Sequence, residues 1–217
     1  MTMDAEMVVA MGLKNGHFSS EDLTYIKRIE QANSMVHVVS EINQNAIEVA
    51  RKKDKERSCG SARGILHGVP ILIKNLFFTT DGLKTTFGCS GLLEAIPSIE
   101  ATTVIKLREQ GAIILGIANG SQWANFRFTP VAVGTALGLC AAALGSETCG
   151  SLILPAQKSA VVGMKPMVGL TSRYGLYSGS GLQDTKTETS TLFYKGMHFS
   201  EARRCTDSNT PPPSKKC

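Results

Sequence analysis

The sequence predicts an α/β fold in which helices flank a mixed β-sheet, and three observations support this class. Of the 217 residues, 42% are hydrophobic and 19% are charged, which is typical of a globular chain long enough to bury a core. Residues 66–73 are rich in leucine and β-branched side chains, as in a buried strand. An amphipathic segment at 102–110 and a second apolar run at 112–115 follow, so a parallel β-α-β unit is expected.

The residues before this unit predict two helices and one short extended segment. Ser19 and Ser20 are placed to cap a helix over residues 23–32, whose apolar side chains repeat on one face. The β-branched run at 36–39 predicts a strand or an extended link. Residues 46–57 predict a further helix with a basic outer face.

The basic residues of that second helix raise the question of nucleic-acid binding. Acidic residues, Asp54 and Glu56, interrupt the basic run that begins at Arg51, which favours a solvated helix face. The net charge of +5 is mild. The chain has neither a Gly-rich phosphate loop ending in Gly-Lys-Ser/Thr nor the aromatic-basic alternation that stacks bases. Nucleotide hydrolysis and nucleic-acid partners therefore have little support.

An uncharged stretch at residues 128–146 is close to the length of a membrane span. It contains Pro130, several glycines and many alanines, but few large apolar residues. A buried helix over residues 132–144 is therefore the favoured interpretation, and membrane contact is the alternative. No membrane partner is expected.

The loop at residues 145–156 is the first candidate site. Ser151 lies there at a tight corner between two apolar runs, where a serine is either a helix cap or a nucleophile. Small residues before it allow successive backbone N–H groups to turn toward one point. If Ser151 attacks a carbonyl, the N–H groups of Thr148, Cys149, Gly150 and Ser151 are the natural donors to the oxyanion.

Lys74 is the second candidate, because it ends the run predicted to be a buried strand. Lysine is rarely buried without a partner. In an apolar site it loses part of its proton affinity and can act as a general base.

These two stretches, in this order, resemble the amidase signature family of serine hydrolases. The resemblance also includes residues 112–116, 123–126 and 161–173, and it extends from about residue 5 to about residue 184. It implies an incomplete amidase signature fold and the hydrolysis of a small-molecule carboxylic amide through an acyl-enzyme, with no metal or organic cofactor. The family's catalytic set is a lysine, a serine with a cis peptide bond and a nucleophilic serine. Lys74 matches the first member and Ser151 the last.

The middle member of this set is missing from the sequence. The bridging serine of the family would fall near Arg127 or Phe128, and neither side chain relays a proton; Thr129 is the nearby hydroxyl. Two interpretations stay open: a serine hydrolase, or a catalytically inactive remnant or binding protein of the same family. A third is a component of a transamidase complex. Because the family uses lysine as base, His67 is interpreted as structural, and Asn75 stands where members commonly have aspartate.

The resemblance also sets the expected domain organisation. Residues 1–184 are expected to form a partial amidase signature domain, divided into a helical part at 1–63 and a catalytic-core part at 64–184. The polar residues 185–217 have the composition of a disordered tail. Since family members continue further, a truncated or misread gene is suspected. Unpaired sheet edges would then favour a homo-oligomer or a covering partner.

The cellular compartment is inferred from cysteines and from the amino terminus. The six cysteines form no C-x-x-C pair, which fits a reduced setting better than a disulfide framework or a metal site. The first residues are acidic and lead into no signal-type apolar run. A cytoplasmic location is therefore expected.

Overall fold

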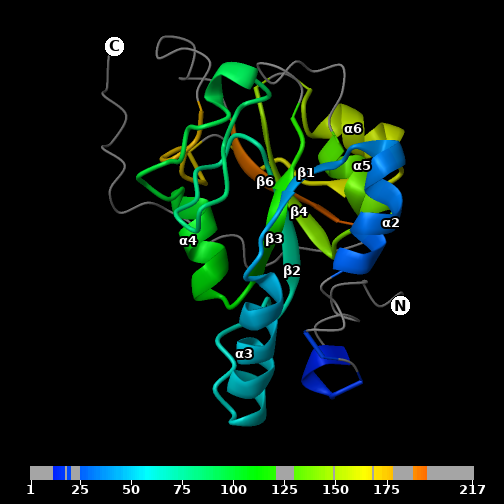
Figure 1. Ribbon diagram of the computed structural model, residues 1–217, viewed down its shortest axis with the longest axis vertical. Coiled ribbons are helices and arrows are strands. Elements are labelled where there is room, and N and C mark those ends of the chain that lie inside the picture. Colours follow the sequence, from blue (N-terminus) through cyan, green and yellow to red (C-terminus); the bar gives the residue numbers. More distant parts are fainter. Residues whose placement is uncertain are drawn as a thin grey trace.

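The computed structural model describes residues 12–17, 19–20, 25–120, 130–148, 150–167, 169–177 and 188–194. Its helices and strands follow one another along the chain (Figure 1): α2 (Ile26–Val36), β1 (Val39–Ile42), α3 (Ala46–Ser58), β2 (Pro70–Lys74), η2 (Ser90–Leu92), α4 (Thr102–Glu109), β3 (Ile113–Ala118), α5 (Pro130–Ala136), β4 (Ala142–Glu147), α6 (Ile153–Lys158), β5 (Val162–Gly163) and β6 (Glu188–Tyr194).

The strands of these described ranges form one mixed sheet in the order β1-β3-β2-β4-β6-β5. Strand β2 pairs in parallel with β3 and with β4, whereas β1, β6 and β5 join the sheet antiparallel. Helix α4 connects the parallel strands β2 and β3, which confirms the predicted β-α-β unit. The two parallel neighbours of β2 place its carboxyl end beside the carboxyl end of β4.

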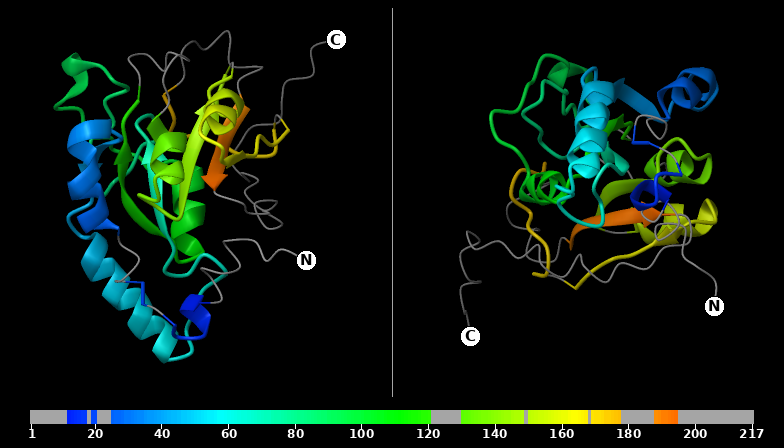
Figure 2. Two further views of the ribbon diagram at one scale, coloured as in Figure 1. Left: turned by 90° about the vertical axis from the view of Figure 1, so that its right-hand side faces the viewer. Right: turned by 90° about the horizontal axis from the view of Figure 1, so that it is seen from below.

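Helices cover both faces of the sheet (Figures 1 and 2), with α4 on one side and α2, α5 and α6 on the other. Successive residues of β2 alternate between the two apolar cores: Ile71 and Ile73 pack on the α4 side, and Leu72 packs on the α5 and α6 side. Both faces are buried, which explains the continuous apolar run of this strand. The predicted fold class, a mixed sheet flanked by helices, is confirmed.

The helix predicted over residues 132–144 is wrong in its second half. Helix α5 ends at Ala136, Gly138 adopts a left-handed conformation (φ 66°), and the chain then enters β4. Residues 142–144 pair with residues 71–73 of β2. Alanine favours helix in isolation, but the hydrogen-bonding edge of β2 and burial on both faces override that preference. In the ranges that the structure describes, no helix is both long and apolar enough to cross a membrane.

The predicted strand at 36–39 is displaced. Helix α2 continues to Val36, the left-handed residue His37 (φ 47°) ends it, and the strand begins at Val39. Strand β2 likewise starts at Pro70 rather than at residue 66, because residues 64–69 form turns. The helix predicted over 46–57 is confirmed by α3.

A strand occurs where a disordered tail was expected. Within residues 185–217, β6 pairs antiparallel with β4. This prediction is therefore wrong for residues 188–194. Their backbone satisfies the edge of β4 that would otherwise be open, a long-range effect that composition does not reveal. Residues 195–217 lie outside the described ranges, and the division into parts at residues 63 and 184 stays a prediction.

Candidate active site

Lys74 lies at the carboxyl end of β2, in the centre of the sheet. The strands β3 and β4 flank β2 and both of its faces are covered, so Lys74 is only 3% exposed. Its Nζ donates a hydrogen bond to the carbonyl oxygen of Ser146 in β4, at 3.3 Å. Burial lowers the pKa of Lys74 from its ordinary 10.5 to about 8, while the negative charge of Glu147 acts in the opposite direction. About one Lys74 side chain in ten is then neutral at pH 7, in the form a general base requires.

Ser151 lies in the corner that joins β4 to α6, as the sequence indicated. Ser151 is buried, with only 6% of its surface exposed. The preceding Gly150 has φ 79°, and a Cβ at this position would meet Leu154 Cδ1 at 2.8 Å. Glycine is therefore required for the turn that leads to Ser151. Lys74 is hydrogen-bonded to β4, the strand that leads into this corner. The two candidate residues therefore lie toward the same end of the parallel strands β2 and β4, their carboxyl end.

A buried carboxylate organises the loop around Ser151. Glu147 Oε2 accepts hydrogen bonds from the backbone N–H groups of Leu152 (2.7 Å) and Ile153 (3.0 Å), and Oε1 accepts one from Lys165 Nζ at 3.2 Å. Burial by itself would raise the pKa of Glu147, but the N–H groups of Ile153, Leu152 and Gly150 and the ammonium of Lys165 outweigh it and lower the pKa. Glu147 is thus an ionised residue that holds the loop in place through these contacts.

The predicted oxyanion donors are only partly described. Thr148, Gly150 and Ser151 lie in the described loop, while Cys149 lies outside it. The N–H of Gly150 interacts with Glu147. The role of these four backbone groups in holding an oxyanion stays a prediction, as do the catalytic roles of Lys74 and Ser151.

The position expected for the bridging serine is outside the described residues. Arg127, Phe128 and Thr129, as well as the stretch at 123–126, belong to the undescribed range 121–129. Their contribution to proton transfer stays a prediction.

Two further contacts near the site were not predicted from the sequence. Asn75 Nδ2 donates to Thr86 Oγ1 and Asn75 Oδ1 accepts from Thr86 N–H, both at 2.7 Å, so Asn75 joins the end of β2 to the loop before η2. The ion pair between Lys165 and Glu147 is the second. The one available signal was a polar residue, Asn75, directly after a buried strand; nothing in the sequence pairs Lys165 with Glu147.

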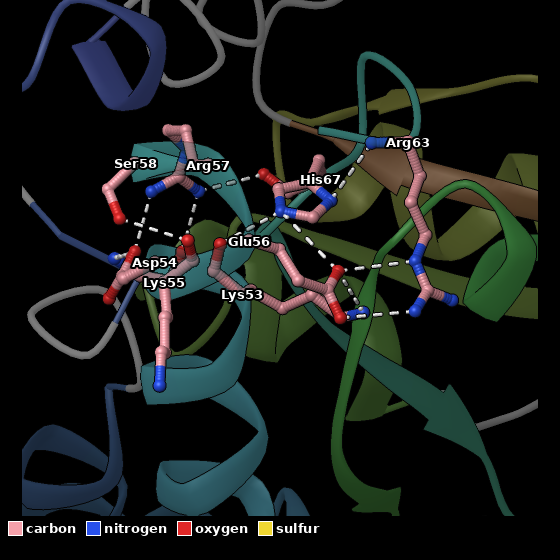
Figure 3. A network of polar contacts seen from close by, with 9 residues as sticks. Lys53, Asp54, Lys55, Glu56, Arg57, Ser58, Arg63 and His67 are labelled. Atoms are coloured by element: carbon pink, nitrogen blue, oxygen red, sulfur yellow. Dashed lines mark hydrogen bonds and ion pairs between the residues drawn. The ribbon is translucent and has the colours of Figure 1, made fainter. Parts of the chain in front are cut away.

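His67 lies at the other end of β2, in the polar network shown in Figure 3. Its Nε2 donates to the carbonyl oxygen of Lys53 at 2.9 Å, and its Nδ1 accepts from the N–H of Arg63 at 3.2 Å, which fixes the tautomer. Burial lowers the pKa of His67. Nearby, Arg57 binds Asp54 at 2.6 Å and the carbonyl oxygen of His67 at 3.1 Å. Both ring nitrogens are engaged, which supports the structural interpretation of His67.

Metal-ligating side chains do not gather at one point in the described ranges. No cluster of three or more His, Cys, Asp or Glu side chains able to hold a metal ion occurs there. Within the same ranges, the cysteines Cys59, Cys89 and Cys140 are free, and burial raises the pKa of Cys140 to about 12.

Comparison with known families decides the identity of the fold. The Amidase family pattern matches residues 23–134 and 131–191, which together make up more than half of the chain. The chain belongs to the amidase family. The resemblance to amidase signature enzymes is thereby confirmed. The amidase match falls into two pieces that meet at residues 131–134, next to the place where the sequence lacks the serine loop.

Several amidase relatives share this part of the chain. A putative amidase from Arthroderma benhamiae is 42% identical over 190 residues, covering 75% of this chain and 32% of that protein. A glutamyl-tRNA(Gln) amidotransferase subunit from Xanthobacter autotrophicus is 34% identical over 196 residues, covering 76% of this chain and 39% of that protein. The native peptide amidase from Stenotrophomonas maltophilia, solved by X-ray crystallography, has a TM-score of 0.80 at 28% identity, covering 94% of this chain and 50% of that chain. The chain thus spans about a third of these relatives' length and half of the solved structure.

Proposed function

We propose that the chain carries the base and the nucleophile of an amide-hydrolysing serine enzyme, Lys74 and Ser151. One observation carries the proposal: a lysine with a pKa near neutrality is buried at the end of β2 and hydrogen-bonded to the strand that leads into the Ser151 corner. A lysine kept only for structure would gain nothing from such burial, because desolvation of its charge costs stability.

The proposed reaction proceeds through an acyl-enzyme. Neutral Lys74 accepts the proton of the Ser151 hydroxyl through a bridging hydroxyl group, for which this sequence offers Thr129 in place of the family's serine, and Ser151 Oγ attacks the amide carbonyl. The N–H groups of residues 148–151 stabilise the developing oxyanion. The amine or ammonia leaves with the proton, and water then attacks the ester to release the carboxylic acid and restore Ser151. The substrate class is a small carboxylic amide, which the names of the relatives support.

A second candidate function is a binding protein that keeps the pocket wall without the chemistry. Two observations favour it: the family match falls into two ranges that overlap at residues 131–134, close to the position expected for the bridging serine, and the Gly150 N–H is already engaged by Glu147. Loss of one member of a proton relay costs orders of magnitude in rate, because such members act as a unit.

A third candidate is a component of a transamidase, favoured by the similarity to a glutamyl-tRNA(Gln) amidotransferase subunit. Co-purification of stoichiometric partner proteins with the tagged chain is its signature. A second copy or a partner covering the sheet edges likewise stays a prediction, and so does the cytoplasmic location.

Labelling with a fluorophosphonate probe tests the proposed hydrolase function. Wild-type protein should be labelled at Ser151, as located by peptide mass spectrometry, and Ser151→Ala should abolish labelling. Ser159→Ala, which removes the hydroxyl at the C-terminal end of α6, is the matched control and should label as wild type. Absence of labelling in folded wild-type protein would refute the hydrolase function and favour the binding protein.

A further inference from the structure

The carboxylate of Glu147 divides its two oxygens between two segments of the chain. Oε2 receives the N–H groups of Leu152 and Ile153, at the start of α6, and Oε1 receives the ammonium of Lys165. Lys165 belongs to the segment that follows β5. A single carboxylate therefore ties the start of α6 and the segment after β5 to the end of β4, next to Ser151.

This arrangement requires Glu147 to be ionised. A protonated carboxyl group would present an O–H to neighbours that are themselves donors, so at least one hydrogen bond would be lost. In the described residues, the charged groups that act on Glu147 are Lys165, in contact, and Lys74, from β2. The two partners differ in exposure, because the Glu147 side chain is 6% exposed and that of Lys165 is 32% exposed. Lys165 thus brings a partly hydrated positive charge to a buried negative one.

We propose that Lys165 is a positioning residue for the loop that carries Ser151: its ammonium holds the Glu147 carboxylate against the amides of Leu152 and Ile153, and thereby fixes Ser151. The reason for holding Ser151 in place rests on the proposed hydrolase function, since a serine nucleophile must be kept close to its attack geometry. Lys165 acts on the loop through its ion pair with Glu147.

Hydrogen–deuterium exchange of the full chain tests the contact without requiring catalysis. In Lys165→Met, the amides of Leu152 and Ile153 should exchange about tenfold faster, because their acceptor is no longer held in place. Lys165→Arg keeps the charge and should restore slow exchange. Lys158→Met removes an exposed lysine from α6 and serves as the matched control, with wild-type exchange expected.

Three results would overturn the proposal: unchanged exchange in Lys165→Met, an equal increase in Lys158→Met, or failure of Lys165→Arg to restore protection. If Lys165→Met does not fold, Lys165→Gln takes its place. Faster exchange in Lys165→Gln than in Lys165→Arg supports the proposal, and equal exchange in the two refutes it.

A second readout applies to enzyme that reacts with the probe. Without Lys165, the charge of Glu147 acts more strongly on Lys74, so the pH dependence of Ser151 labelling should move upward by about half a unit. A merely structural role for Lys165 would lower the labelling rate at every pH without this shift. If wild type is not labelled at all, the hydrolase function fails while the exchange experiment still decides the role of Lys165.

Discussion

A buried basic side chain lies at each end of strand β2, and the two differ in how completely their surroundings pair them. Before its amino end, His67 has both ring nitrogens hydrogen-bonded, and the surrounding network pairs Lys53 and Arg63 with Glu56 and Arg57 with Asp54 (Figure 3). At its carboxyl end, Lys74 donates to the neutral carbonyl of Ser146. Satisfied polar networks stabilise a fold, whereas an incompletely compensated base stays available for proton transfer. This contrast supports the proposal that the His67 end of β2 has a structural role and that the Lys74 end carries the chemistry.

The largest expected effect comes from Lys74→Met. Labelling of Ser151 should fall by about three orders of magnitude, because the proposed base is removed. Stability should rise, since the pKa of Lys74 is about 8 when folded and 10.5 ordinarily, which corresponds to a cost of about 3 kcal/mol at neutral pH. Probe labelling and urea unfolding at pH 7 measure the two changes.

The sign of this cost follows from proton binding. Between pH 8 and pH 10.5 the unfolded chain binds the Lys74 proton and the folded chain does not, so wild-type stability should rise with pH in this window. Lys74→Met should lack this rise. A variant that loses stability at pH 7 while labelling normally would reverse the assignment of the two ends.

His67→Ala should give the next largest effect, now on stability. The change leaves the carbonyl of Lys53 and the N–H of Arg63 without their hydrogen-bond partner and opens a cavity, at an expected cost of about 2–4 kcal/mol. His17→Ala, at an exposed histidine, is the control and should change the unfolding free energy little. The folded fraction of His67→Ala should still be labelled at Ser151; loss of labelling there would make His67 part of the chemistry.

The sequence reveals the fold where a pattern is local. The continuous apolar run of β2 and the amphipathic pattern of α4 are sufficient to predict the parallel unit, because strands buried on both faces carry such runs. Residues 142–147 carry no such decisive local pattern, since an alanine-rich sequence is compatible with either a helix or a strand. Only pairing with β2 decides between them. Strand β6 is missed for the same reason, because its partner is β4.

The candidate site shows the same limit. Lys74 and Ser151 could be proposed as candidates because each is unusual in its own surroundings: a lysine at the end of a buried strand, and a serine in a small-residue corner. Lys165 and Thr86 could not, because their contacts with Glu147 and Asn75 join segments that the sequence does not connect. The position expected for the bridging serine lies in residues 121–129, outside the described ranges.

The smallest effect is expected for Arg63→Ala. Its guanidinium binds Glu56 at the rim of the network, where the Arg63 side chain is 47% exposed, so solvent screens the ion pair. The substitution keeps the backbone N–H of residue 63, which donates a hydrogen bond to His67 Nδ1. The unfolding free energy in urea should fall by less than about 1 kcal/mol. A loss as large as that of His67→Ala would show that the guanidinium, rather than the buried ring, holds the network together.

The pH dependence of Ser151 labelling tests the central claim most directly, because it identifies the base. If Lys74 is the base, the labelling rate of wild type should rise about tenfold per pH unit and level off above about pH 8, the pKa of Lys74. A plateau reached at or below about pH 6.5, the ordinary pKa of a histidine, or a rate independent of pH, would contradict the assignment of Lys74 as the base.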